Sequence, residues 1–166
     1  MQNSSTNHRM DGLVLDNSYS RLPPRFYQKL APAKVTAPKI ISFNESLASD
    51  LGIDLQSLTA LKRAEIFSGN TIPNTSQPLA MVYAGHQFGS FVPQLGDGRA
   101  ILLGEVKDAR SALHDIQLKG AGRTLYSRQG DGRSALGPVL REYLVSESMH
   151  ALGVRVNFRI EILYTH

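Results

Sequence analysis

The 166-residue sequence contains no cysteine, and it has no apolar run long enough to span a membrane. Without cysteine the chain forms neither disulfides nor thiolate metal sites, which fits a reducing compartment, and we expect a cytoplasmic location. The missing apolar run predicts no transmembrane helix and no membrane partner. The first twelve residues are polar and lack the apolar centre of a secretory signal.

Several functional motifs are also absent. The chain has neither G-x-G-x-x-G nor G-x-x-x-x-G-K-[ST], the two common phosphate-loop patterns, and it has no nucleophile elbow. His86, His114 and His166 do not have metal-binding spacing. The basic residues are scattered and form no recognised nucleic-acid module, so we expect no nucleic-acid partner. The formal net charge of +4 suits phosphate binding and an ordinary basic surface equally well.

Glycine, in contrast, is concentrated between Tyr83 and Arg133. Nine glycines fall in this stretch, and the tetrapeptide Gly-Asp-Gly-Arg occurs twice, at 96–99 and at 130–133. Glycine loses the most backbone freedom on folding, so this density indicates sharp turns or a backbone that approaches a ligand closely. The remaining composition, with 42% hydrophobic and 19% charged residues, is that of a globular protein.

The pattern along the chain predicts three segments. We expect a disordered tail over residues 1–18, an N-terminal wrap with helices over 19–78, and a nucleotide-binding unit over 79–166. Predicted strands are Lys39–Phe43, Ala80–Tyr83, Arg99–Val106, Asp115–Lys119 and the alternating segment after Gly153. In Asp115–Lys119 the alternation puts Ile116 and Leu118 on one face, with the polar residues on the other.

Three helices are predicted from caps and apolar spacing. Asn44 is a good N-cap for a helix that ends at Leu51, and Asp54 is the expected cap of a second helix. The apolar side of that second helix would comprise Leu55, Leu58, Leu61 and Ile66. The third and longest helix covers Ser134–Leu152, with Leu136, Leu140 and Leu144 at four-residue spacing and Pro138 in its first turn.

The candidate site combines the glycine-rich stretch with two charged residues. Lys119 ends a predicted strand, and Glu142 follows 23 residues later beside the apolar stripe of the long helix. A strand lysine paired with a helix glutamate after a glycine-rich hairpin is typical of protein kinases. Gly96 and Gly98 would allow backbone amides to face phosphate oxygens, and Arg99 would add charge. The same residues also fit a hairpin turn with surface charges.

Long strings of the sequence resemble the selenoprotein O family of kinase-like protein adenylyltransferases. These strings are SYSRLPPRFY, LAMVYAGHQFGSFVPQLGDGRAILLGEV, DIQLKGAG, YSRQGDGR and REYLVSESMHALG, and they cover most of residues 18–153. The resemblance implies an α+β fold: the N-terminal lobe of a kinase-like enzyme, with an antiparallel hairpin sheet and one positioning helix. In this family ATP binds inverted, so AMP instead of phosphate passes to serine, threonine or tyrosine hydroxyls of proteins.

The resemblance also implies roles for individual residues. ATP would be contacted by Gly96, Gly98, Arg99, Lys119, Asp131 and Gly132, and Lys119 with Glu142 would be the positioning pair. It implies a divalent cofactor, Mg²⁺ or Mn²⁺, with ligands in a C-terminal lobe, so no metal ligand is expected in this chain. Since that lobe would also hold the general base, the chain alone is expected not to transfer AMP. The alternative is a non-catalytic nucleotide-binding or interaction module.

Two structural expectations follow from these roles. Lys119 and Glu142 should lie within salt-bridge distance of each other. Replacing Gly98 with a β-branched residue should weaken ATP binding more than it weakens folding, because a branched Cβ resists positive φ and blocks close approach of the backbone.

Overall fold

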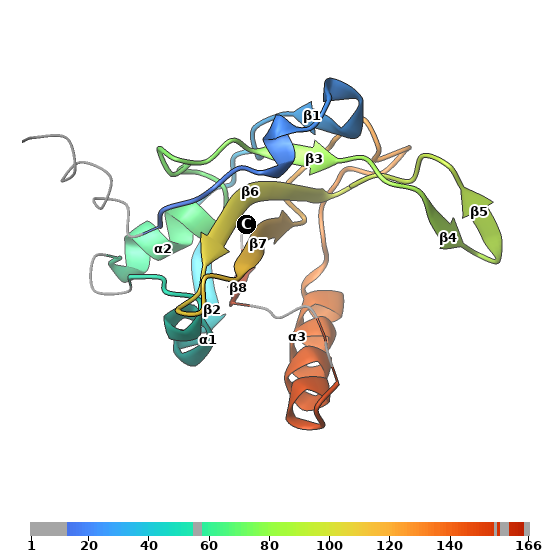
Figure 1. Cartoon of the computed structure of the whole chain (residues 1–166). Helices are drawn as coiled ribbons and strands as arrows, with labels where there is room; N and C mark the ends of the chain where they lie inside the picture. Colours follow the sequence, from blue (N-terminus) through green and yellow to red (C-terminus); the bar gives the residue numbers. More distant parts are fainter. Residues whose placement is uncertain (1–12, 55–57, 155, 157–159, 165–166) are drawn as a thin grey trace, which may run out of the picture.

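The computed structural model describes residues 13–54, 58–154, 156 and 160–164, and its main feature is an antiparallel sheet (Figure 1). The sheet has the strand order β1-β3-β6-β7, with β1 at Tyr27–Lys29, β3 at Leu79–Met81, β6 at Ala100–Lys107 and β7 at Leu113–Lys119. Two further antiparallel pairs are β2 (Lys39–Phe43) with β8 (Glu161–Tyr164) and β4 (Gly85–Gln87) with β5 (Ser90–Val92). The helices are α1 (Glu45–Asp50), α2 (Ala60–Phe67) and α3 (Leu136–Ala151). The predicted α+β class with an antiparallel hairpin sheet is confirmed.

The β6–β7 hairpin forms the centre of the sheet. Every residue of β6 from Ala100 to Val106 is buried, as expected for a strand that is covered on both faces. In β7 only Ile116 and Leu118 are buried, which confirms the predicted alternation. The register pairs Ala100 with Lys119, so the lysine lies at the end of the sheet where the Gly96–Arg99 turn leads into β6.

The prediction of a disordered tail through residue 18 is wrong for residues 13–18. Leu13 and Leu15 are buried in the main hydrophobic core. Asp16 forms a two-way backbone bridge with Glu105 of β6, with both N–O distances at 2.8 Å. Two leucines that alternate over three residues are too short a pattern to identify as a strand, yet they provide enough apolar surface to bind this segment to the sheet. Residues 1–12 lie outside the described residues.

The two predicted segments 19–78 and 79–166 share one sheet and one core. β1 belongs to the first segment, and it pairs with β3 of the second. β2 likewise pairs with β8, and Ala48 of α1 and Ile66 and Phe67 of α2 belong to the same core cluster as residues of β6 and β7. The proposed boundary at residues 78 and 79 therefore does not divide the fold, because strand pairing between segments distant in sequence has no local signal.

The first helix, α1, agrees with its prediction, whereas α2 begins later than expected. The Asn44 side chain caps α1 by accepting the Leu47 amide at 2.9 Å. The cap of α2 is Thr59, whose hydroxyl accepts the Lys62 amide at 3.3 Å, so the prediction that Asp54 is the cap is wrong. Both residues are good caps, and the sequence alone does not decide between them.

The apolar side predicted for α2 is partly correct. Leu58 and Ile66 are buried, as expected, but Leu61 is 72% exposed. Leu61 is the second residue of a helix that begins at Ala60, and there it points away from the core. Leu55 lies outside the described residues.

The third helix, α3, has the predicted extent but not the predicted packing. It runs from Leu136 to Ala151, with Pro138 in the first turn, where a missing N–H costs nothing, and with Gly153 in a left-handed conformation beyond its end. Ser146 is its buried residue, whereas Leu144 of the predicted apolar stripe is 64% exposed. Figure 1 shows α3 below the sheet, and the Asn44 side-chain amide donates to Glu147 of this helix at 3.2 Å.

The last predicted strand is shorter than the alternating sequence suggested. β8 covers Glu161–Tyr164, and most of residues 154–160, together with 165–166, lie outside the described residues. Among the described residues no helix combines the length and the apolar character that crossing a membrane requires.

Candidate functional site

A cavity of about 500 Å³ lies between the polar face of β7, the first turns of α3 and the segment around Lys34. Its charged lining residues are Lys34, Arg99, Lys119 and Arg133, against the two carboxylates of Asp115 and Glu142. This excess of basic side chains favours an anionic ligand. The volume is in the range of sites that bind small molecules and cofactors.

Lys119 and Glu142 form an ion pair at this cavity. The Lys119 Nζ lies 2.8 Å from Oε1 and 2.6 Å from Oε2 of Glu142. The predicted contact between β7 and α3 is therefore present. Both side chains remain about one-third exposed, and an ion pair so accessible to water contributes little to stability. The ion pair instead determines geometry, because it holds the Lys119 ammonium group at the cavity wall and connects α3 to the sheet.

The first Gly-Asp-Gly-Arg copy packs beneath Tyr126. Gly96 has φ of +67°, and a Cβ placed there would lie 2.5 Å from the Tyr126 ring. Gly98 is outside the left-handed region, so the expectation that positive φ requires this glycine is wrong. A Cβ at Gly98 would instead lie 2.8 Å from the Tyr126 carbonyl oxygen. Both glycines are thus required by packing, and of this copy only Arg99 lines the cavity.

Asp97, between these glycines, is 6% exposed, and its side chain accepts hydrogen bonds. Its Oδ2 accepts the Met81 amide at 3.1 Å and the Gln117 side-chain amide at 3.0 Å. Burial raises the pKa of Asp97 above its ordinary value, and these hydrogen bonds oppose the shift because they favour the charged form.

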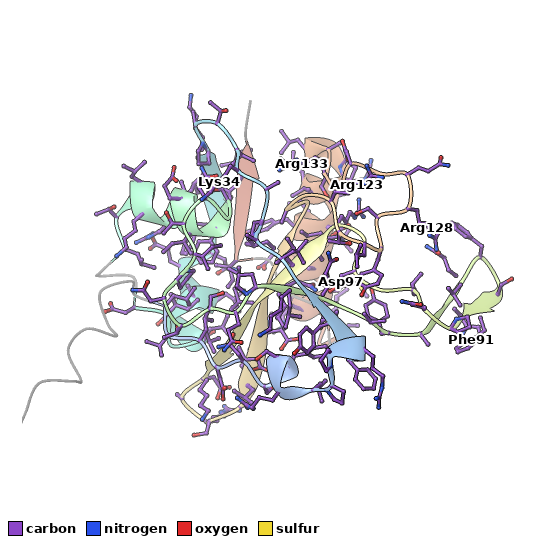
Figure 2. All side chains as sticks on the ribbon, turned by 90° about the horizontal axis from the view of Figure 1, so that it is seen from above. Lys34, Phe91, Asp97, Arg123, Arg128 and Arg133 are labelled. Carbon is purple, nitrogen blue, oxygen red and sulfur yellow. The ribbon has the colours of Figure 1, made fainter. Side chains whose placement is uncertain are left out.

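The second copy has a different structure. Asp131 is exposed, and its Oδ1 accepts the Arg133 amide at 2.9 Å. Gly132 has φ of +73°, and a Cβ there would lie 1.9 Å from the Gly122 carbonyl oxygen. Arg133 lines the cavity and donates to the Lys34 carbonyl at 3.5 Å. Figure 2 shows Arg123 and Arg133 in the same region, above the first turns of α3.

The structure brings together some of the predicted site residues. Arg99, Lys119 and Glu142 line one cavity, whereas Gly96 and Gly98 lie behind Arg99 under Tyr126. Asp131 and Gly132 belong to the loop that precedes the cavity residue Arg133 and are not part of the lining.

Several other lining residues were not predicted, among them Lys34, Gln117 and Arg133. A signal existed for Arg133, because it ends the second copy of the repeated tetrapeptide. Gln117 could have been found as the polar neighbour of Lys119 two positions earlier on the same strand face. Lys34 had no signal, since a proline-rich segment reaches the site only through tertiary packing.

The β4–β5 hairpin, also part of the glycine-rich stretch, extends away from the cavity (Figure 1). Phe88 at its tip is 94% exposed, and it shares the turn with Gly89. Arg128 contacts this hairpin by donating a hydrogen bond to the Gln87 side-chain oxygen at 2.8 Å. Gly89 therefore serves the turn of this hairpin, Gly85 begins β4, and neither glycine lines the cavity.

The described residues contain no group of three or more histidine, aspartate or glutamate side chains arranged to hold a metal ion. Of the two carboxylates at the cavity, Glu142 bonds Lys119, whereas Asp115 is an exposed residue of β7 whose pKa is raised mainly by partial desolvation. This part of the chain therefore does not fit a complete divalent-metal site.

Comparison with known proteins identifies the family of this chain. The family model described as protein adenylyltransferase SelO matches residues 11–165. Among curated proteins named protein nucleotidyltransferase YdiU, that of Rhizobium meliloti strain 1021 is 63% identical over 147 residues, which cover 87% of this chain and 29% of the relative. That of Rhizobium rhizogenes strain K84 is 66% identical over 142 residues, covering 86% of this chain and 28% of the relative. That of Rhodopseudomonas palustris strain TIE-1 is 63% identical over 139 residues, with coverages of 84% and 28%.

The chain thus spans less than a third of the length of these curated relatives. The matched range includes both Gly-Asp-Gly-Arg copies and the Lys119–Glu142 ion pair. Because the family model covers nearly the whole sequence, the chain belongs to the SelO family of protein adenylyltransferases.

Proposed function

We propose that this chain supplies a nucleotide-binding wall of a protein adenylyltransferase, which transfers AMP from ATP to serine, threonine or tyrosine hydroxyls of proteins. The observation that carries the proposal is the Lys119–Glu142 ion pair at a basic cavity that Arg99 also lines. The names of the relatives support nucleotidyl transfer. Because the chain spans only 28–29% of those relatives, the activity of the whole enzyme and its substrates are part of the proposal.

The residues divide the binding task between them. Glu142 orients the Lys119 ammonium, which would contact phosphate oxygens of ATP, and the Arg99 guanidinium would supply forked donors from the adjacent turn. Gly96 and Gly98 permit the close packing that aims Arg99 at the cavity. Asp131 and Gly132 would contact the nucleotide from the loop that leads into Arg133. The volume and basic lining of the cavity fit a polyphosphate.

In the proposed reaction a protein hydroxyl oxygen forms a bond to the α-phosphorus while the bond from that phosphorus to the pyrophosphate oxygen breaks. The hydroxyl proton passes to a general base, and the leaving pyrophosphate gains negative charge. Lys119 and Arg99 would stabilise that charge, which is the main role of cations in phosphoryl-type transfer. Mg²⁺ or Mn²⁺ is the proposed metal. Since the described residues form no site for it, we assign it no step here.

The test is incubation with α-labelled ATP, manganese and a protein acceptor. A version extended with the remaining part of the Rhizobium meliloti relative should incorporate label, and Lys119→Ala in that version should abolish it. Lys107→Ala is the matched control, because Lys107 is an exposed lysine at the opposite end of the β6–β7 hairpin. Label transfer that survives Lys119→Ala would refute the assigned role of this lysine.

The chain without that extension should bind ATP but not transfer AMP. It carries one phosphate-facing wall, and positioning from both sides supplies most of the rate in such reactions. If the short chain incorporated label and lost it on Lys119→Ala, the division of the site between this chain and the rest of the relatives would be wrong.

A further inference from the structure

We propose that Asp97 is a positioning residue of the nucleotide site, whose carboxylate joins the Gly96–Arg99 turn to β7, the strand that carries Lys119. Its effect on the nucleotide rests on the proposed function, whereas its effect on the backbone does not. Figure 2 shows Asp97 near the middle of the molecule, beside the segment that carries Arg123 and Arg128.

The side chain of Asp97 connects two strands that are not neighbours. Its Oδ2 accepts the backbone amide of Met81 on β3 at 3.1 Å and the side-chain amide of Gln117 on β7 at 3.0 Å. In the sheet order, β6 lies between β3 and β7. The main chain adds a further bond, from the Asp97 amide to the Met81 carbonyl at 2.9 Å. One residue therefore fixes where the turn sits relative to both strands.

The opposite side of the turn is bonded to the loop after β7. The Thr124 hydroxyl donates to the Asp97 carbonyl at 2.6 Å, and the Ser127 hydroxyl donates to the Gly98 carbonyl at 2.5 Å. The Arg99 carbonyl accepts the Gly120 amide at 2.7 Å. The turn is thus bonded on both sides, and the Asp97 carboxylate is its side-chain connection to β3 and β7.

This connection reaches the cavity through Gln117. Gln117 and Lys119 are two residues apart on the same face of β7, and both line the cavity together with Arg99. The Asp97–Gln117 bond therefore sets the spacing between the cation of the turn and the cation of the strand. Burial raises the pKa of Asp97, because the charged carboxylate loses hydration in the interior of the protein. Placing this carboxylate there therefore has a desolvation cost. Such a buried, hydrogen-bonded carboxylate specifies geometry more than it adds stability.

Two variants and one control test the proposal. Asp97→Ala removes all the side-chain bonds, whereas Asp97→Asn keeps one oxygen that can accept from Met81 and Gln117. Asp108→Ala is the control, because Asp108 also accepts backbone amides, of Arg110 and Ala112, but at the far turn of the same hairpin. Each protein is measured by amide hydrogen exchange without ligand and by calorimetric titration with ATP.

We expect Asp97→Ala to speed exchange of the Gly120 amide and to lower ATP affinity at least about tenfold, since bonds to a charged group are lost. Asp97→Asn should restore slow exchange and lose less than about threefold in affinity. Asp108→Ala should speed exchange only near its own turn and leave ATP affinity unchanged. A merely structural role would lower the unfolding temperature in both alanine variants without this difference in affinity.

The proposal is overturned if Asp97→Ala leaves exchange at Gly120 as in the wild type, or if ATP affinity is unchanged while only the unfolding temperature falls. Should Asp97→Ala not fold, Gln117→Leu removes the cross-strand bond alone and must speed exchange at Gly120 for the proposal to stand. If the wild type binds no ATP, the proposed function fails, and the exchange pattern still decides the positioning role of Asp97.

Discussion

The tetrapeptide Gly-Asp-Gly-Arg occurs twice in this chain and folds in two ways. At 96–99 the first glycine has positive φ and the aspartate is buried. At 130–133 the second glycine has positive φ and the aspartate is exposed. Both copies nevertheless end in an arginine that lines the same cavity.

The two copies differ in which residue of the tetrapeptide contacts the rest of the fold. In the first copy the aspartate side chain connects the turn to β3 and β7. In the second, the Gly132 backbone packs against Gly122, and Asp131 bonds only within its own loop. Identical local sequences thus take the conformation that their contacts impose, and the arginine is what they share.

The largest expected effect concerns the glycine contacts of the second copy. Gly132→Ala should lower the free energy of unfolding by roughly 3 kcal/mol, because the new Cβ meets the Gly122 carbonyl and the backbone has positive φ. Gly130→Ala is the matched control, since its nearest contact is 3.2 Å and its φ is outside the left-handed region. Urea unfolding of both variants is the measurement. Equal destabilisation would contradict the packing that distinguishes these two glycines.

In the first copy both glycines should matter. Gly98→Ala should cost about 2 kcal/mol in urea unfolding, because its Cβ would press on the Tyr126 backbone carbonyl. This result would differ from the expectation based on sequence, in which ligand approach was the main reason for the glycine. A variant with wild-type stability and weakened ATP binding would favour the sequence-based explanation.

Some elements of this structure could be predicted from the sequence and others could not. The Lys119–Glu142 contact was expected from the kinase arrangement and from the family resemblance. The β6–β7 hairpin, α1 and the extent of α3 were predictable, because strand alternation, caps and helical spacing are local signals. The packing of Leu13 and Leu15, the contribution of Lys34 to the cavity and the reason for Gly98 were not. Each of these depends on a contact between segments distant in sequence, for which the chain carries no local pattern.

The two arginines should differ in their contribution to ATP binding. Arg99→Ala should lower affinity about tenfold, because a charged donor beside Lys119 is lost. Arg133→Ala should lower it about threefold, since the Arg133 guanidinium already donates to the Lys34 carbonyl. Calorimetric titration compares the two. A larger loss for Arg133 than for Arg99 would reverse the order assigned to the two copies.

The smallest effect concerns pH. Burial raises the pKa of Asp97 in the folded protein above the value near 3.8 of an unperturbed carboxyl, so between these two pKa values the native state binds more protons than the unfolded state. The free energy of unfolding should therefore fall as pH rises through that window. Asp97→Asn should remove this contribution, which urea unfolding at several pH values would detect. Identical pH profiles in both proteins would contradict the raised pKa.

We propose above all that this chain binds ATP through Lys119. The most direct measurement is calorimetric titration of ATP into the wild type, Lys119→Ala and Lys107→Ala. We predict that Lys107→Ala binds as the wild type does, and that Lys119→Ala loses at least about tenfold in affinity while its unfolding temperature changes little, because the ion pair is partly exposed. Equal affinity in Lys119→Ala and wild type, or no ATP binding by the wild type, would contradict the account.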